Sequence, residues 1–248
     1  MAQIVKMVLY FLLKIKVMYS QNGEDKIVKK YFDNVQLKTN IELPLRCVLE
    51  IGANDGSTLS NSRLLIENGW EAVLLEPSSA YQKLTEFHSN ADTFDDIPID
   101  IKTPRRNGSL VRLYNYGIGE KTEKVNFYES GSILRSGDTN LVSSIQPDQR
   151  WQEETSFVKK QVQLYHFEDF LKKFNLEFFD FISIDAEGMD WIILQQIDLE
   201  YHCTSCVCVE WNGDNNLLKL FTEYCNGYGL KEIHRNAENL IFARDLEL

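Results

Sequence analysis

Short apolar runs alternate with amphipathic helical patterns along most of this chain, and this alternation restricts its fold more than any other feature. "PLRCVLEIG" and "WEAVLLEP" are apolar runs that end at glycine or proline, and a helical pattern follows each of them. Runs that are apolar on both faces are typical of parallel strands, which helices cover from both sides. The sequence therefore predicts an α/β fold with a mostly parallel sheet and helices on both faces.

The same alternation continues in the second half of the chain. "FDFISIDAEG" and "SCVCVEWN" are predicted strands, and a helical pattern follows each. "LKEIHR" and "NLIFAR" predict a closing antiparallel pair.

The middle of the chain is more irregular. We expect one strand across "LVRLYNYGIG" and another at "KVNFYES", with loops at residues 91–110 and 130–157. A long loop inside a compact domain is often a lid or a binding loop, so residues 130–157 are the predicted wall for a second ligand. Tyr128 and Trp151 would supply aromatic surface there.

The length of 248 residues suits one domain, which we expect at residues 41–248 after a helical extension at residues 1–40. "MVLYFLL" near the start is too short to cross a bilayer. We expect this segment to dock on the body as a helix. Association of residues 1–18 with a membrane surface is the alternative.

Charge and cysteine content exclude some classes of function. The net charge of -11 disfavours nucleic acid as the main partner, because phosphates are neutralised by clustered lysine and arginine. Five cysteines in a chain of this length do not suggest a disulfide framework. Cys206 and Cys208 alternate with valine as strand residues do, so we expect buried thiols and a cytoplasmic protein.

The turn after the first predicted strand carries the strongest ligand signal. It reads "EIGANDG", so Gly52 and Gly56 open the backbone, but the middle glycine of a dinucleotide fingerprint is missing. Glu50 precedes the turn, and Glu76 ends the second strand. A carboxylate at Glu50 would repel a pyrophosphate and favour a cationic ligand. Glu76 could accept hydrogen bonds from both hydroxyls of a ribose. Ammonium, sulfonium and ribose together describe S-adenosylmethionine.

The sequence resembles FkbM-type methyltransferases over about residues 19–212. The resemblance rests on "SQNGED", "EIGANDGSTLSNS", "GW", "LLEPS", "NYGIG" and "SIDAEGMD", which occur in the order typical of that family. It implies a Rossmann-like class I methyltransferase fold, S-adenosylmethionine as cofactor, and hydroxyl groups of sugars or secondary metabolites as acceptors.

By the same resemblance, the first turn would hold the amino-acid end of the cofactor, Glu76 would hold the ribose, and Asn115 or Tyr116 would lie near the adenine. The candidate cofactor residues are Glu50, Gly52, Ala53, Asn54, Asp55, Gly56, Asn61, Glu76, Pro77, Asn115, Tyr116 and Asp185.

Three acids at predicted strand ends are candidates for catalysis. Asp185 and Glu187 follow one strand, and Glu210 ends another. An alcohol needs a base to accept its proton as the new bond forms, and Asp185 is the first candidate. Glu187 could instead cap the next helix. His166 and His202 are weaker alternatives, and no histidine-rich ligand set argues for a metal.

These observations lead to one hypothesis, two rivals, and a third possibility, which is methylation of RNA or protein. The hypothesis is an S-adenosylmethionine-dependent methyltransferase that acts on oxygen of a small hydroxylated acceptor, such as a carbohydrate. A nicotinamide-dependent oxidoreductase could use the same sheet, although the missing glycine argues against it. A protein that binds S-adenosylmethionine without catalysis is the other alternative.

Overall fold

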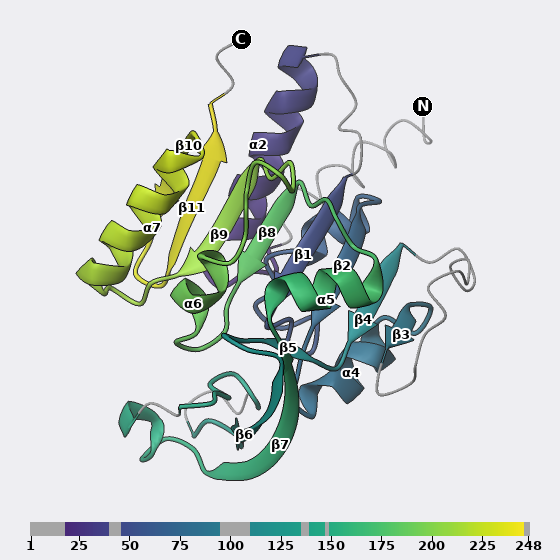
Figure 1. Cartoon of the computed structure of the whole chain (residues 1–248), viewed down its shortest axis with the longest axis vertical. Helices are drawn as coiled ribbons and strands as arrows, with labels where there is room; N and C mark the ends of the chain where they lie inside the picture. The colour runs from purple at the N-terminus through teal and green to yellow at the C-terminus, as the bar shows by residue number, and fades with distance from the viewer. Residues whose placement is uncertain (1–17, 40–45, 95–109, 135–138, 147–148, 246–248) are drawn as a thin grey trace, which may run out of the picture.

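An eight-stranded sheet forms the centre of the molecule, with the strand order β10-β11-β9-β8-β1-β2-β4-β3 (Figure 1). The computed structural model describes residues 18–39, 46–94, 110–134, 139–146 and 149–245. The strands are β1 (Cys47–Ile51), β2 (Glu71–Leu75), β3 (Asp92–Phe94), β4 (Val111–Tyr114), β8 (Phe181–Ile184), β9 (Cys206–Glu210), β10 (Leu230–Arg235) and β11 (Asn239–Arg244).

The strands of this sheet run parallel except at one edge. β3, β4, β2, β1, β8 and β9 form parallel pairs, and β11 is antiparallel to both β9 and β10. The predicted α/β class, the mostly parallel sheet and the closing antiparallel pair are therefore confirmed.

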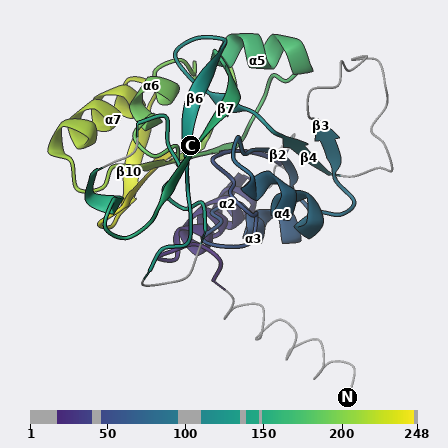
Figure 2. The same cartoon turned by 90° about the horizontal axis from the view of Figure 1, so that it is seen from below.

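Helices cover both faces of the sheet (Figure 2). One face carries α2 (Glu24–Thr39), α3 (Arg63–Glu67) and α4 (Ala80–Phe87). The other carries α5 (Phe167–Phe174), α6 (Asp190–Leu194) and α7 (Asn215–Gly227). Successive side chains of a strand point to opposite faces, so Val48 packs in the first layer while Leu49 and Ile51 pack in the second. This double burial explains why the strands read as continuous apolar runs.

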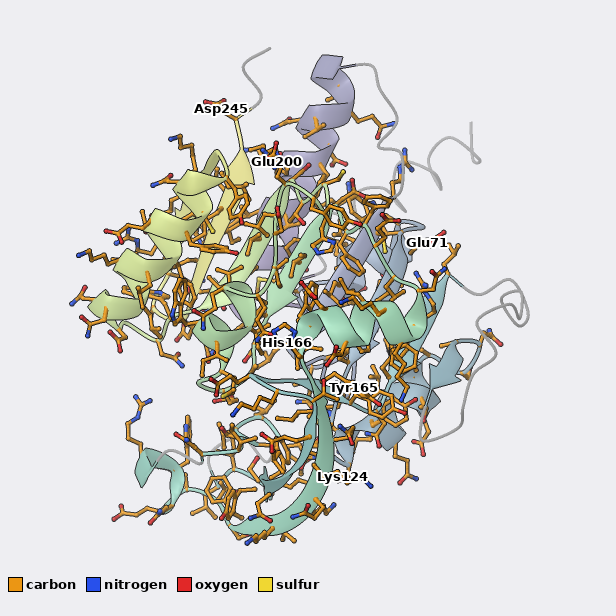
Figure 3. The ribbon with its side chains drawn as sticks, viewed as in Figure 1. Glu71, Lys124, Tyr165, His166, Glu200 and Asp245 are labelled. Atoms are coloured by element: carbon orange, nitrogen blue, oxygen red, sulfur yellow. The ribbon has the colours of Figure 1, made fainter. Side chains whose placement is uncertain are left out.

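A second, three-stranded sheet lies beyond the carboxyl ends of the central strands (Figure 1). Its strands are β5 (Gly117–Ile118), β6 (Glu123–Ser130) and β7 (Phe157–Tyr165), in the order β5-β7-β6. β6 and β7 pair antiparallel along their length, and the segment between them includes the short 3-10 helix η2 (Gln149–Trp151). Figure 3 shows Tyr165 and His166 where β7 passes into α5.

The prediction of one strand across residues 110–119 is wrong. The chain leaves the central sheet after Tyr114 and joins the second sheet at Gly117. Asn115 stabilises this break, because its side-chain amide donates to the main-chain oxygen of Glu76 at 2.8 Å. The break lets one stretch of chain serve both sheets.

The loop predicted at residues 91–110 is wrong at its beginning, where β3 pairs parallel with β4. Residues 95–109 lie outside the described part of the chain, as do the apolar segment within residues 1–17 and the boundary near residue 40. No helix among the described residues combines the length and apolar character needed to cross a membrane.

The sheet reverses its order beside β1. From β1 the chain adds β2 and β4 on one side and later β8 and β9 on the other. Ligands of open α/β sheets bind at the carboxyl ends of the strands where such a reversal occurs. The candidate site residues that follow β1, β2, β8 and β9 therefore meet at this edge.

Candidate active site

A cavity of about 890 Å³ opens at the carboxyl ends of β1, β2, β8 and β9. The second sheet and the segment between β6 and β7 close the cavity on the opposite side. Ten of the candidate residues line it: Glu50, Gly52, Ala53, Asn54, Asn61, Glu76, Pro77, Asp185, Glu187 and Glu210. Asp55, Gly56, Asn115 and Tyr116 are not among the described lining residues.

Gly52 allows the turn after β1 to pass directly beside the end of β8. Its φ is +90°, and a Cβ at this position would lie 1.8 Å from the main-chain oxygen of Asp185. The amide of Asp185 also donates to the oxygen of Ile51 at 3.0 Å. Only glycine fits between these two strand ends.

Gly56 packs against α4, whereas the sequence analysis placed it among the candidate cofactor residues. Its φ is +71°, and a Cβ there would lie 2.5 Å from Cδ1 of Leu84. Gly56 thus allows α4 to pack closely behind the turn. The side chain of Asp55 accepts hydrogen bonds from the amides of Ser57 and Thr58, so it shapes the turn.

The carboxylate of Glu50 is held by the segment that leads into α3. It accepts hydrogen bonds from the amide of Asn61 at 3.1 Å and from the hydroxyl of Ser62 at 2.6 Å. Burial raises the pKa of Glu50, and these hydrogen bonds oppose the rise. The side-chain amide of Asn61 reaches across to the hydroxyl of Ser183 at 3.2 Å. Glu50 is therefore fixed in place at the cavity wall.

Glu76 is fixed by two main-chain amides. One carboxylate oxygen accepts from the amide of Asn54 at 2.8 Å, and the other accepts from that of Ser78 at 2.7 Å. Each carboxylate oxygen has about two acceptor positions, so each can accept a further hydrogen bond. Burial raises the pKa of Glu76, while the Ser78 and Asn54 hydrogen bonds oppose the rise and the charge of Glu129 adds to it.

An apolar part of the wall lies beside Glu76, and most of its residues were missed by the sequence analysis. It consists of Pro77, Gly117, Ile118, Phe127 and Leu164. A Cβ at Gly117 would lie 2.6 Å from Cδ2 of Leu164 and 3.4 Å from Cγ of Pro77. The two sheets therefore meet closely here.

Asn115 lies next to this wall, and Tyr116 lies behind it. Asn115 bonds to the main chain of Glu76, and the ring of Tyr116 is buried against the rings of Tyr165 and Phe174. That either of them contacts an adenine stays a prediction.

The three candidate catalytic acids come together. Asp185, Glu187 and Glu210 each place a carboxylate oxygen within 4.8 Å of those of the other two. Asp185 follows β8 and Glu210 ends β9. Glu187 lies in the turn after β8 with a φ of +49°, and its carboxylate is close to both of the others. Such a triad of oxygen ligands could also hold a divalent cation.

The sequence offered Glu187 as a cap for the helix that follows, but Asp190 is the residue that binds main-chain amides of the turn before α6. Its carboxylate accepts hydrogen bonds from the amides of Ala186 and Gly188, both at 3.2 Å.

Crowding of carboxylates changes their protonation. Asp185 faces the cavity and is exposed there, while protein encloses it on its other sides. This burial, with the nearby charges of Asp190 and Glu50, raises the pKa of Asp185 to about 7. Burial and the charge of Asp185 raise the pKa of Glu210 well above its ordinary value. The triad therefore holds at least one proton at neutral pH.

The two histidines considered as bases are not among the described lining residues. His166 precedes α5 (Figure 3). His202 is buried, and its ring contacts the main-chain oxygen of Glu177.

The N-terminal turn forms part of the rim. Gln21 lines the cavity, and the fully buried Glu24 anchors the turn. The Glu24 carboxylate accepts from the amide of Asn22 at 2.8 Å and from the side chains of Asn236 at 2.6 Å and Asn239 at 2.9 Å. These contacts join the turn to the connection between β10 and β11.

Two tryptophans also line the cavity, Trp151 as expected and Trp211 in addition. The indole N–H of Trp211 donates to the main-chain oxygen of Asn236 at 2.9 Å, which fixes its ring. Tyr128 is not among the described lining residues.

No disulfide joins the five cysteines, which all lie in the described part of the chain, and Cys206 and Cys208 are buried in β9 as expected.

Comparisons with known proteins agree with this arrangement. Residues 50–228 match the family described as "Methyltransferase FkbM domain". No curated protein matches the chain.

The solved structures that resemble this chain have low sequence identity to it. The N-terminal domain of human METTL16 in complex with SAH is 12% identical, with 92% of this chain and 72% of that chain covered and a TM-score of 0.43. The METTL16 MTase domain is 12% identical, with 86% and 66% covered and a TM-score of 0.41. A fibrillarin/Nop5p complex is 13% identical, with 86% and 79% covered and a TM-score of 0.37. This chain thus spans about two thirds of the METTL16 MTase domain chain.

The family match covers well over half of the residues and includes the turn after β1 and all three acids of the triad. The chain therefore belongs to the FkbM methyltransferase domain family, a class I methyltransferase fold whose cofactor is S-adenosylmethionine.

Proposed function

We propose that this protein transfers the methyl group of S-adenosylmethionine to a hydroxyl of a small acceptor without negative charge, such as a carbohydrate. The observation that carries the proposal is one continuous cavity that joins the Glu50 and Glu76 wall to the triad of Asp185, Glu187 and Glu210.

The residues on the strand-end side fit the cofactor. Glu76 can accept bonds from the ribose hydroxyls, and the apolar wall of Ile118, Phe127 and Leu164 suits the adenine. Glu50, Gly52 and Asn54 would surround the amino-acid end. When bound, S-adenosylmethionine supplies a methyl group already activated by its positive sulfur.

The charge of the cavity supports a cationic cofactor and disfavours anionic ligands. Among the described lining residues, seven are acids and one, Arg150, is basic. A pyrophosphate would be repelled by this wall, so the nicotinamide-dependent oxidoreductase fits less well. The same field disfavours RNA and phosphorylated acceptors.

The triad supports transfer to oxygen. An alcohol is a weak nucleophile at neutral pH and gains reactivity when a base accepts its proton. A carboxylate with a pKa near 7, as at Asp185, suits this role. Glu187 and Glu210 would orient the hydroxyl, while burial and the charges of Asp190 and Glu50 keep the pKa of Asp185 raised.

The opposite wall supports an acceptor with an apolar face and several hydroxyls. Ile133, Leu141 and Ile145 supply apolar surface, and Trp211 supplies a fixed aromatic ring. Gln21 and Glu238 on the rim could bond to hydroxyl groups.

The remaining parts of the proposal concern organisation and compartment. We keep residues 41–248 as the methyltransferase domain, with residues 1–40 as an extension whose helix α2 contacts α3 and β11. Five cysteines that form no disulfide in the described part of the chain suit a reducing, cytoplasmic compartment.

Calorimetry and an acceptor screen test the proposal. S-adenosylhomocysteine should bind to one saturable site, whereas NADH should give no heat. A homocysteine-product assay should then give turnover with at least one neutral sugar or related alcohol. Turnover with RNA alone, or binding of NADH instead, would overturn it. Cofactor binding without turnover on any acceptor class would favour the non-catalytic alternative.

A further inference from the structure

One hydrogen bond joins the acceptor-side wall to the turn that carries the acids. The hydroxyl of Ser144 donates to the main-chain oxygen of Glu187 at 2.8 Å. Ser144 is only 4% exposed, so water does not readily replace this contact. The two residues are 43 positions apart in the sequence, and the bond joins the segment between β6 and β7 to the turn after β8.

The main chain of Ser144 is itself fixed on the second sheet. Its amide donates to the oxygen of Tyr128 at 3.1 Å, and its oxygen accepts from the amide of Tyr128 at 2.9 Å. The two preceding residues are attached to Ser130, whose hydroxyl accepts from the amide of Val142 at 3.3 Å and whose amide donates to the hydroxyl of Ser143 at 3.0 Å. The hydroxyl of Ser144 is therefore presented from a residue that an isolated antiparallel bridge ties to β6.

The turn at the other end of the bond needs outside support. Glu187 has a φ of +49°, in the left-handed region, and Gly188 follows with a φ of +97°. A residue other than glycine in this region costs about 1–2 kcal/mol and persists where the surroundings hold it. Asp190 holds the amides on either side of Glu187, and Ser144 holds the carbonyl of Glu187 itself.

We propose that Ser144 is a positioning residue for methyl transfer, which acts by keeping Glu187 in the conformation that directs its carboxylate toward Asp185 and Glu210. The catalytic meaning of this inference rests on the proposed function, whereas its structural part does not. Since Leu141, Val142 and Ile145 of the same segment line the cavity, the contact also sets the distance between the acceptor wall and the acids.

Three variants of the full chain separate this role from a general effect on stability. Ser144→Ala removes the hydroxyl. Ser144→Thr keeps it. Thr139→Ala removes a hydroxyl from the same segment, where it accepts from Lys83 at the surface and does not line the cavity.

Hydrogen exchange tests the structural part with S-adenosylhomocysteine present or absent. In Ser144→Ala the amides of residues 186–188 should exchange about fivefold faster than in the wild type, as loss of one buried hydrogen bond implies. Ser144→Thr and Thr139→Ala should stay close to the wild type. Equal exchange in all four proteins overturns the inference, whatever the protein catalyses.

Turnover tests the catalytic part with the first acceptor that the screen selects. Ser144→Ala should lower kcat about tenfold, while KM for S-adenosylmethionine and affinity for S-adenosylhomocysteine stay within about twofold. Ser144→Thr should restore kcat. An unchanged kcat in Ser144→Ala, or an equal fall in Thr139→Ala, overturns the positioning role. If no acceptor is turned over, the proposed function fails and the exchange result alone decides the structural part.

Discussion

The main-chain oxygen of Asp185 lies 1.8 Å from the point that a Cβ on Gly52 would occupy. The turn after β1 and the end of β8 are thus in direct backbone contact, and the amide of Asp185 bonds to Ile51 on the same side. Gly52, which opens the turn after β1, and Asp185, the first candidate base, are therefore parts of one structural unit. A change of the backbone at Gly52 should therefore disturb both the turn after β1 and the acid triad.

Replacement of Gly52 tests this contact. Gly52→Ala should destabilise the protein by more than about 2 kcal/mol, because the new methyl group meets backbone that cannot move aside. Gly69→Ala is the matched control, since Gly69 has a similar φ of +87° but nothing within 4 Å of the added Cβ. Chemical denaturation should show a loss of about 1 kcal/mol for the control. Equal losses in the two variants would contradict the contact.

Glu76 should determine cofactor affinity. Glu76→Gln replaces a carboxylate that accepts two main-chain amides, so the NH₂ group of glutamine must face one of them. We expect S-adenosylhomocysteine to bind at least about tenfold more weakly in calorimetry. Glu71→Gln, at the other end of the same strand and partly exposed, serves as control and should bind normally. Unchanged affinity in Glu76→Gln would remove this residue from the cofactor site.

Asp185 should govern turnover more than binding. Asp185→Asn keeps the shape of the side chain but cannot accept a proton, so kcat should fall at least about a hundredfold. Affinity for S-adenosylhomocysteine should stay within about threefold of the wild type. Steady-state kinetics and calorimetry measure the two quantities separately. A variant with full turnover would exclude Asp185 as the base.

The pH dependence of turnover follows from the raised pKa of Asp185. A base acts in its deprotonated form, so kcat should rise as the pH increases through about 7 and fall below it. Initial rates between pH 5.5 and 9, at about ten times KM for both substrates, test this. A profile that is flat across this range would contradict the assignment of Asp185.

Glu24 should stabilise the fold in its charged form. Its hydrogen bonds to Asn22, Asn236 and Asn239 lower its pKa against the opposing effect of burial. A lowered pKa contributes stability above the unfolded value of about 4.3 that is lost as the pH falls through the folded value. Glu24→Gln should therefore cost about 2–3 kcal/mol at pH 7 and less near pH 3.5.

Denaturation at both pH values measures this difference. Glu200→Gln, an exposed glutamate in the turn between α6 and β9, is the control (Figure 3) and should change stability by less than about 0.5 kcal/mol. A loss in Glu24→Gln that is the same at both pH values would show that its charge is not responsible.

The sequence could predict the features that depend on local pattern. The buried strands before Gly52 and Pro77 are apolar on both faces, and the acids at strand ends meet because parallel strands end at one edge. Contacts between distant segments could not be predicted in this way. Gly117 joins the second sheet by pairing with Leu164, which no local pattern indicates.

In the candidate site, too, contacts between distant segments could not be predicted from local pattern. Glu50 was correctly placed at the mouth of the turn, yet its bonds to Asn61 and Ser62 depend on how the connection to α3 folds back. The apolar wall at Gly117 and Ile118 lies two residues beyond Asn115 and Tyr116, because the chain leaves the central sheet at that point.

Calorimetric titration of the full chain with S-adenosylhomocysteine tests the central claim most directly. We expect one saturable site per chain, with a rise in unfolding temperature as the ligand concentration increases. Absence of both heat and thermal stabilisation would contradict the claim that this acid-framed cavity holds a cationic nucleoside.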